Sequence, residues 1–401
     1  MISENNLLRV NKVNKMHILN VNTSLDMEAG GGTAERTFQM SRFLASIQDI
    51  ECTVLTLDLD LEQSRVDSIA PARVVALRCI SRRFYVPWVS WRVIANLVIK
   101  SNVVHLMGHW SILNTLVYFA CRFYKKPYVV CPAGALGLFG RSTILKTLYN
   151  FIVGNRMIRN ASAWIAVTKS EFSQFESHGI TEDDITIIPN GVCKAGFEKY
   201  NVDRFREINR LPDLPMILFM GRLNLIKGPD LLLEAFINSS KNLQNYHLVY
   251  AGADEGMMKS LKSRVKEKNL ENFIHFLGFI GEEEKTSAYR SASLLVVPSR
   301  KEAMSIVALE AGVCGIPVMI TDQCGFSDIC SVDSRLEVPA TIASISEGLD
   351  SLLKDPKELE GIALKFKEYV EKKYSWNTLT PIYIDLYEKL LSNNYITPSK
   401  R

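Results

Sequence analysis

The eight cysteines of this 401-residue chain are scattered, and no two of them form a C-x-x-C pair. This spacing excludes a zinc ribbon and gives no sign of a disulfide framework. No window of about 18 residues is apolar and free of charge, so no transmembrane helix is predicted. The first residues, MISENNLLRVNKVNK, lack the apolar region of a signal peptide, and we expect a cytoplasmic protein.

Acidic residues are absent from a long internal stretch. Between Asp67 and Glu171 there is no aspartate or glutamate, whereas the same span contains 14 lysines and arginines. This acid-free span predicts a cationic half of the molecule and an anionic partner, either a membrane surface, a phosphate-rich substrate or nucleic acid. No RNA-recognition, helix-turn-helix or zinc signature accompanies it, so we do not expect nucleic acid as the partner.

Short apolar runs alternate with helical patterns through most of the chain. With 47% hydrophobic and 22% charged residues, the composition is that of a globular protein, and the length suits two domains. Near-continuous Val, Ile and Leu strands between helices favour parallel sheets covered on both faces. The predicted strands are residues 17–23, 52–58, 102–108, 127–132, 163–168, 215–221, 246–252, 272–278, 293–299 and 316–321.

A polar stretch at residues 197–215 separates two such sets of strands and helices. We therefore predict an N-terminal doubly wound α/β domain over residues 1–200 and a C-terminal one over residues 201–375. A last helix, residues 376–401, is expected to return to the first domain. In open parallel sheets ligands bind beyond the carboxyl ends of the strands, so two facing sheets would place a site in the cleft between them.

The stretch MGRLNLIKGPDLLLEAF, residues 220–236, directly follows a predicted strand. Gly221 allows a tight exit, and the cations Arg222 and Lys227 lie five residues apart before a helix that starts at Gly228. Fixed cations beside free N–H groups at a helix start suit a diphosphate. A solvated basic loop is the alternative that this spacing leaves open.

Three consecutive glycines, Gly30, Gly31 and Gly32, lie in the first predicted β–α loop, before a helix. Glycine lets a backbone approach a ligand closely, and a helix N-terminus favours an anion. The pattern is not G-x-G-x-x-G, so it gives little support to a dehydrogenase-type dinucleotide site. A plain flexible loop remains the alternative.

Two glutamates eight residues apart follow the buried run LLVVP. Glu302 is expected at the strand exit, with the amides of Ala303, Met304, Ser305 and Ile306 opening the next helix. Glu310 would lie roughly 12 Å further along the helix axis. That separation is too long for a shared metal ion and matches the two ends of a nucleotide-linked sugar.

The ordered motifs of the chain resemble those of the retaining glycosyltransferases of family 4, which have the GT-B fold. The series runs from GGGTAER through GHW, CPAGAL, IAVTKSE and IPNGV to G-R-x4-K-G, YAGADEG, HFLGFI and E-x7-E before GIPV. The resemblance implies two Rossmann-like domains, a nucleoside-diphosphate sugar as donor, no metal and no other cofactor. It implies a hexose-type sugar, and a glycan or lipid-linked acceptor in cell-surface polysaccharide or lipopolysaccharide assembly.

The resemblance also implies roles for single residues. Arg222 and Lys227 would bind the donor diphosphate, Glu310 the ribose, and Glu302 the hexose with the amides of Ala303–Ser305. Backbone near Gly252 and Leu277–Phe279 would contact the base, and the Gly30–Gly32 loop would close over the phosphates or the acceptor. Attack on the face from which the diphosphate leaves would retain the anomeric configuration without an enzymic nucleophile.

Three departures from the family pattern concern the hexose. Similar enzymes often have E-G-F-G where this chain has E-A-M-S, so that Ala303 replaces the first glycine and Met304 the aromatic residue. Ala133 stands where many of these enzymes have a histidine. His109 in GHW is the nearest candidate to share that histidine's role, although it could simply pack beside Trp110. His105, inside a predicted strand, is expected to be a core residue, and Asn190 with Gly191 to shape a turn.

Two further expectations complete the analysis. The departures leave open a non-catalytic scaffold of the same fold that binds sugars or anionic lipid. Residues 141–159 are predicted to form a helix with Ile144, Leu145, Leu148 and Ile152 on one side and with accompanying cations. Together with the basic, aromatic residues 82–92, this helix would suit the headgroup layer of an anionic membrane. We therefore expect possible peripheral association with the inner face of the cytoplasmic membrane.

Overall fold

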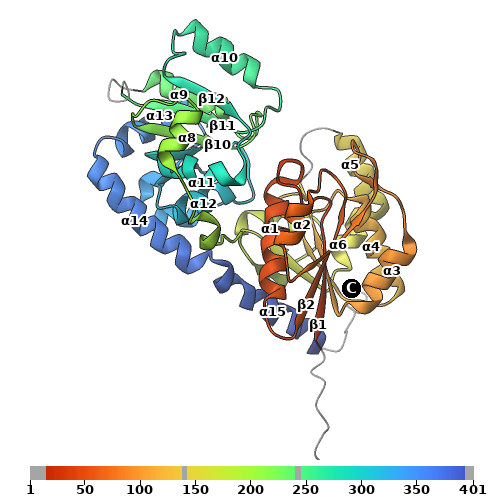
Figure 1. Ribbon diagram of the computed structural model, residues 1–401. Helices are drawn as coiled ribbons and strands as arrows, with labels where there is room; N and C mark the ends of the chain where they lie inside the picture. The colour runs from red at the N-terminus through yellow and green to blue at the C-terminus, as the bar shows by residue number, and fades with distance from the viewer. Residues whose placement is uncertain (1–14, 138–141, 240–244, 393–401) are drawn as a thin grey trace, which may run out of the picture. The chain divides into compact units, whose positions relative to one another are not determined.

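The computed structural model describes residues 15–137, 142–239 and 245–392, and the chain divides into two compact units (Figure 1). The first unit lies within Met1–Pro132, Leu138–Trp164 and Leu386–Arg401, and the second within Ala133–Gly137 and Ile165–Asp385. The domain boundaries predicted at residues 200 and 375 stay predictions.

The first sheet has seven strands in the order β3-β2-β1-β6-β7-β8-β9. Its central strands are short runs of Val, Ile and Leu, and β6 is buried at every position, as a strand covered on both faces must be. All five strands predicted for this part are confirmed. The strands are β1 (Met16–Val21), β2 (Ile50–Leu57), β3 (Arg73–Leu77), β6 (Val103–Met107), β7 (Tyr128–Cys131), β8 (Ala163–Ala166) and β9 (Ile185–Ile187).

Helices connect these strands, and a small hairpin of β4 (Cys79–Ser81) and β5 (Val86–Pro87) lies outside the sheet. The first helix packs on the sheet through residues such as Met40 and Leu44, which are both buried. The helices are α1 (Met27–Ala45), α2 (Gln63–Ser68), α3 (Trp91–Lys100), α4 (Ile112–Phe123), α5 (Thr143–Tyr149), α6 (Asn155–Arg159) and α7 (Phe172–Glu176).

The helix predicted over residues 141–159 is confirmed from Thr143 onward, with one irregularity. A π-helical turn, η1 (Asn150–Gly154), separates α5 from α6. Arg141, with which the prediction began, lies outside the described residues. Such π-turns are rare and are found frequently at functional sites.

The second sheet has six strands in the order β12-β11-β10-β13-β14-β15, and its five predicted strands are confirmed. They are β10 (Met216–Met220), β11 (His247–Ala251), β12 (Ile274–Gly278), β13 (Leu294–Val297) and β14 (Val318–Thr321), to which the short β15 (Glu337–Val338) adds an edge. The helices are α8 (Val202–Ile208), α9 (Pro229–Asn238), α10 (Met258–Glu267), α11 (Glu282–Ser291), α12 (Ile306–Val313), α13 (Ile342–Leu352), α14 (Pro356–Lys373) and α15 (Trp376–Ser392).

Each sheet reverses its strand order at one place. In the first sheet the chain moves outward from β1 to β3 and then returns to pair β6 with the other side of β1. In the second sheet β13 pairs in the same way with β10. Because the loops after the two adjoining strands diverge there, a crevice opens at the carboxyl edge of the sheet. The loops after β1, β6, β10 and β13 are therefore where ligand sites are expected.

His105 is a core residue, as predicted. It is fully buried in β6, and its Nδ1 lies 2.7 Å from the hydroxyl of Tyr387 in α15. Burial lowers the pKa of His105 to about 3, so the ring is neutral at physiological pH. This histidine contributes to packing in the first unit and has no exposed surface for a ligand.

Candidate functional site

The loops after β10 and β13 meet at the strand-order reversal of the second sheet. Gly228 precedes α9 with a φ of +67°, and a Cβ at this position would lie 2.1 Å from the carbonyl oxygen of Pro298. Only glycine allows both the left-handed backbone and this approach. The close approach brings Lys227 to Glu302, and their side chains form an ion pair that is largely shielded, with exposed fractions of 23% and 14%.

Arg222, at the start of the same loop, is engaged by a carboxylate. Its Nη1 lies 2.7 Å from Glu255 Oε1, and the amide of Asn224 donates to Glu255 Oε2 at 2.6 Å. The arginine remains about half exposed. Both cations predicted to bind a diphosphate thus lie on one loop, each beside a carboxylate that an incoming anion would have to replace.

Several contacts fix the loop that carries Glu302. The amide of Glu302 donates to Gln323, and Asn190 donates from Nδ2 to the Met304 carbonyl at 2.9 Å. Ser305 caps α12 by accepting from the amide of Ala308. Asn190, predicted to shape a turn, thus holds the backbone beside Glu302.

The amides of Ala303, Met304 and Ser305 precede α12, which begins at Ile306, so they do not form its first turn as predicted. The estimate of 12 Å between the two glutamates assumed helical rise throughout, and that assumption is wrong for residues 302–305. The Ala303–Ser305 amides nevertheless lie immediately before a helix start, where an anionic or hydroxyl oxygen is favoured.

Glu310 lies in α12, as predicted, and is buried with a relative exposure of 4%. Lys285 donates to Oε1 at 2.5 Å and Tyr289 to Oε2 at 2.6 Å, both from α11. Burial and the Glu310 carboxylate raise the pKa of Tyr289, so its hydroxyl stays protonated and donates.

Sequence reasoning missed three of these partners: Lys285, Tyr289 and Glu255. Lys285 and Tyr289 are four residues apart and therefore share one face of α11. That spacing was the available signal, but nothing in it pointed to Glu310. Glu255 follows β11 in the YAGADEG motif, from which only Gly252 was predicted to contact a ligand.

The backbone positions predicted to contact a base lie at the same edge of the second sheet. Gly252 directly follows β11, and its amide donates to the Gly278 carbonyl at the end of β12. Leu277 is within β12, and Phe279 follows it with 56% of its surface exposed. An exposed aromatic ring at this edge of the sheet is suited to stack on a planar ligand.

In the first unit, the three glycines, which were predicted to precede a helix, lie at the kink that joins a short helical segment from Met27 to the main part of α1. Gly31 interrupts the helical geometry with φ +55° and ψ −140°, while Gly30 and Gly32 flank this kink. Asn22, at the end of β1, secures the following turn by donating to the Thr33 carbonyl and to Thr37 Oγ1, both at 2.9 Å. The kinked start of α1 is thus held from the strand side.

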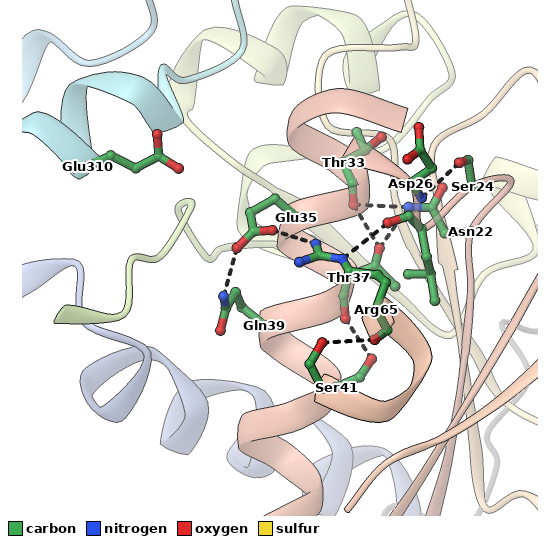
Figure 2. Close-up of polar contacts among 12 residues, drawn as sticks. Asn22, Ser24, Asp26, Thr33, Glu35, Thr37, Gln39, Ser41, Arg65 and Glu310 are labelled. Carbon is green, nitrogen blue, oxygen red and sulfur yellow. Dashed lines mark hydrogen bonds and ion pairs between the residues drawn. The ribbon is translucent and has the colours of Figure 1, made fainter. Parts of the chain in front are cut away.

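The same helix is tied on its outer side by an ion pair. Arg65 Nη2 lies 2.6 Å from Glu35, and both side chains are mostly buried (Figure 2). The guanidinium of Arg65 also stacks on Phe38, 3.5 Å from the ring centroid. These contacts hold α1 against α2, so the part of α1 that follows the glycine kink is fixed in position.

His109, the predicted substitute for a sugar-contacting histidine, is buried with 1% of its surface exposed. Its Nε2 lies 2.8 Å from Asn150 Oδ1, and its ring packs edge-on against Trp110. The alternative that His109 packs beside Trp110 is therefore what the structure shows. Direct contact of His109 with a substrate stays a prediction that requires this ring to become accessible.

Ala133 stands in the second unit at a left-handed φ of +50°. The next amide, that of Gly134, donates to Glu171, whose other oxygen accepts from Val167 at 2.5 Å. Glu171 is buried, so it holds two backbone segments together. Across residues 15–137, 142–239 and 245–392, no three His, Cys, Asp or Glu side chains are placed to hold a metal ion.

Comparison with known proteins places these features in a family. The model of the family described as glycosyl transferases group 1 matches residues 201–372, and that of glycosyltransferase family 4 matches residues 30–194. An uncharacterized glycosyltransferase of Methanocaldococcus jannaschii is 31% identical over 52% of this chain and 54% of its own. The lipopolysaccharide 1,2-N-acetylglucosaminetransferase of Salmonella typhimurium is 28% identical over 54% of this chain and 60% of its own.

The fold has solved counterparts. Anabaena HepE in complex with UDP and glucose superposes with a TM-score of 0.74 at 15% identity, covering 93% of this chain and all of that one. The chain spans only 54–60% of the length of the curated relatives named above. With two Rossmann-like α/β units of the GT-B fold and matches to both family models over most of its length, this chain belongs to the family 4 glycosyltransferases.

Proposed function

We propose that the protein transfers a hexose-type sugar from a nucleoside-diphosphate sugar to a glycan or lipid-linked acceptor during assembly of a cell-surface polysaccharide. The observation that carries the proposal is the Lys227–Glu302 ion pair at the strand-order reversal of the second sheet, with Arg222 on the same loop as Lys227 and paired with Glu255. The names of the relatives support it, since one is a lipopolysaccharide N-acetylglucosaminetransferase and HepE was solved with UDP and glucose.

The proposed chemistry needs no enzymic nucleophile. The acceptor oxygen forms a bond to the anomeric carbon while the bond from that carbon to the diphosphate oxygen breaks on the same face. The acceptor's proton passes to the departing phosphate oxygen, and the anomeric configuration is retained. Arg222 and Lys227 stabilise the charge that develops on the diphosphate, so positioning and electrostatics supply the catalysis without a metal.

Glu302 and Glu310 hold the two ends of the donor in this proposal. Glu302, beside Lys227 and the Ala303–Ser305 amides, accepts from hexose hydroxyls. Glu310 accepts from the ribose, while Lys285 and Tyr289 fix the carboxylate. The exposed ring of Phe279 and the backbone at Gly252 lie at the same sheet edge and would receive the base.

A panel of nucleoside diphosphates and their sugars tests the donor assignment. We expect one nucleoside diphosphate to raise the melting temperature more than the others, since a ligand that binds only the folded state stabilises it. The corresponding sugar nucleotide should be hydrolysed slowly to free sugar, with α-linked donors giving α products. Absence of both effects with uridine, guanosine and adenosine diphosphates would favour the non-catalytic scaffold.

That scaffold is the second candidate, because Ala133, Ala303 and Met304 depart from the family pattern around the hexose. Binding of sugar or anionic lipid without any release of nucleoside diphosphate would distinguish it. The largely shielded Lys227–Glu302 ion pair favours the enzyme, because a sugar-binding surface has no need for a cation beside the carboxylate.

For the acceptor we infer a membrane-borne or lipid-linked glycan, with the protein bound peripherally to the inner face of the cytoplasmic membrane. No helix among the described residues has the length and apolar character to cross a bilayer. Among the described residues of the first unit, every exposed large apolar side chain lies in the acid-free span between Asp67 and Glu171. An apolar surface from a span that carries cations and no acidic residue complements an anionic bilayer. Of the exposed arginines, Arg82 is paired with Asp60 from outside the span.

We call these fifteen residues the docking surface. They come from the β4–β5 hairpin and the loop that follows it, from α3 and α4, and from α5 with η1. They are Ile80, Phe84, Tyr85, Trp88, Val89, Trp91, Ile99, Ile112, Phe119, Phe123, Ile144, Leu145, Leu148, Phe151 and Ile152. Ile144 and Phe151 are the most exposed, at 82% and 80%. Exposed cations such as Arg83, Arg92 and Arg156 accompany them, and each near anionic lipid contributes about 1 kcal/mol.

Flotation with vesicles measures this binding. The protein should float with vesicles containing about 30% anionic lipid at low salt, and binding should weaken at about 0.5 M salt as the charges are screened. Phe151→Asp should reduce flotation, whereas Leu364→Asp, an equally drastic change on the exposed surface of the second unit, should not. Wild-type protein that stays at the bottom of every gradient would leave only a soluble acceptor.

A further inference from the structure

The helical segment that carries part of the docking surface turns two polar side chains toward the β6–α4 loop. Ile144 and Phe151 are exposed, whereas Tyr149 and Asn150, at the junction of α5 and η1, make hydrogen bonds to that loop. The π-helical turn starts at Asn150 and rotates the side chains that follow it about the helix axis, relative to their positions in a continuous α-helix. One segment thus has an apolar outer side and a polar inner side.

Tyr149 and Asn150 contact the loop at three points and α4 at one. The Tyr149 hydroxyl lies 2.9 Å from Thr115 Oγ1, 3.0 Å from the His109 carbonyl and 3.3 Å from the Ser111 carbonyl. Asn150 Oδ1 can only accept, so the proton of His109 is on Nε2, which donates to it at 2.8 Å. These bonds fix both the loop backbone and the tautomer of His109.

The space around the His109–Asn150 bond is closed by a glycine. A Cβ at Gly154 would lie 2.3 Å from Asn150 Oδ1 and 3.0 Å from His109 Nε2. Any larger residue at this position would separate the two groups. The π-helical turn and Gly154 together allow the helix to approach His109 this closely.

The contacted loop belongs to the crevice of the first sheet. Ser111 accepts at Oγ from Thr23, which follows β1, at 3.1 Å, and it caps α4 by accepting from the amide of Asn114. β1 and β6 are the two strands between which the order of the first sheet reverses. The segment formed by α5 and η1 is therefore hydrogen-bonded to one of the two loops where a ligand of this unit is expected, and Ser111 links that loop to the other.

A bilayer can shift the conformation of the loop only if it binds one state of the protein more tightly than another. The two states compared here are the one in which α5 and η1 are hydrogen-bonded to the loop and the one in which they are not. The Tyr149–Thr115 bond supplies the difference in affinity, because it ties α5 to α4. Thr115, Phe119 and Phe123 are spaced by four residues and lie along one side of α4, and the two phenylalanines belong to the docking surface. When Tyr149 is bonded to Thr115, the apolar residues of α4 and α5 meet the bilayer together.

We propose that Tyr149 and Asn150 are positioning residues that couple docking on an anionic bilayer to the loop at His109–Ser111, so that the bilayer raises the rate of sugar transfer. The inference rests on the proposed transferase function and on the docking surface, and it adds regulation of that function by the membrane. Coupling between two sites is commonly worth about 5- to 150-fold.

The test compares rates with and without vesicles. Transfer from the donor to water or to a soluble acceptor is measured with vesicles containing about 30% phosphatidylglycerol and with pure phosphatidylcholine vesicles. The wild type should be stimulated about fivefold or more by the anionic vesicles alone. Asn150→Ala and Tyr149→Phe should float with the vesicles as the wild type does, yet their stimulation should fall below about twofold. Asn155→Ala, the same change further along the same segment, should retain the wild-type ratio.

Hydrogen exchange of the backbone at residues 108–115 gives a readout that needs no donor. Anionic vesicles should slow exchange there in the wild type and Asn155→Ala but not in Asn150→Ala. Full stimulation and protection in Asn150→Ala and Tyr149→Phe would overturn the coupling, as would a wild type that floats without either response. Vesicle-dependent protection without any sugar release would instead overturn the transferase function and leave the coupling standing, and a wild type that does not float would overturn docking and coupling together.

Discussion

Replacing Arg222 or Lys227 by alanine is expected to lower turnover by on the order of 10²-fold or more, because each change removes a fixed cation from the charge that develops on the leaving diphosphate. The loss at Lys227 has a second cause. Its partner Glu302 is only 14% exposed and would be left without its cation in a shielded position. We therefore expect Lys227→Ala to weaken donor binding as well as turnover, whereas the more exposed Arg222 should affect mainly turnover.

Steady-state rates with the donor identified by the thermal panel measure these effects. Lys266→Ala in α10 and Arg204→Ala in α8 are matched controls, because both residues are exposed in the same unit and away from the two loops. The controls should keep near-native turnover. If Arg222→Ala and Lys227→Ala keep it too, the assignment of the diphosphate to this loop is wrong.

The second large effect separates the two glutamates. Glu310→Gln should weaken binding of the bare nucleoside diphosphate by roughly 1.5–3 kcal/mol, since a ribose hydroxyl loses its charged acceptor. This corresponds to roughly a 10- to 150-fold rise in the dissociation constant. Glu302→Gln should impair transfer while leaving that binding nearly intact, because a nucleoside diphosphate has no hexose for Glu302 to contact.

Calorimetry with the bare diphosphate distinguishes the outcomes, and equal losses in both variants would show that the two ends are wrongly placed. Glu310 is buried with Lys285 and Tyr289, so its replacement also disturbs a packed ion pair. Tyr289→Phe controls for this, because it removes one bond to Glu310 and keeps the carboxylate. Thermal unfolding of all three variants shows whether a loss of binding reflects a loss of folded protein.

The sequence predicted most of the strands inside the sheets, and it missed three of the four at the edges. Nine of the ten predicted strands lie between two neighbours, where a largely apolar run is required, and only β12 is an edge strand. β3 was missed because its sequence, RVVAL, is partly exposed at the sheet edge and begins with a charge. β9 and β15 are three and two residues long, too short for any periodicity to register.

The candidate site was predictable where it depends on local sequence. Gly228 before Pro229 indicates a helix start, and the position of Glu302 could be predicted from the apolar run of β13 just before it. The partners were not predictable in this way, because they depend on which elements the fold brings together. Lys227 meets Glu302 across 75 residues, and Asn150 meets His109 across 41 residues. The π-helical turn that allows the second contact has no sequence signature that periodicity could detect.

The two sheets reverse their strand order at equivalent positions, so the two units share one topology. β1 and β10 each open a sheet, and in each sheet the fourth strand along the chain returns to pair with the opener. Across these equivalent positions, hydroxyls join the loops in one unit, Thr23 to Ser111, and opposite charges join them in the other, Lys227 to Glu302. The same architecture thus presents an uncharged bridge in one copy and an ionic bridge in the other. This difference between the two bridges suits a neutral, hydroxyl-rich ligand in the first unit and a phosphate-bearing ligand in the second.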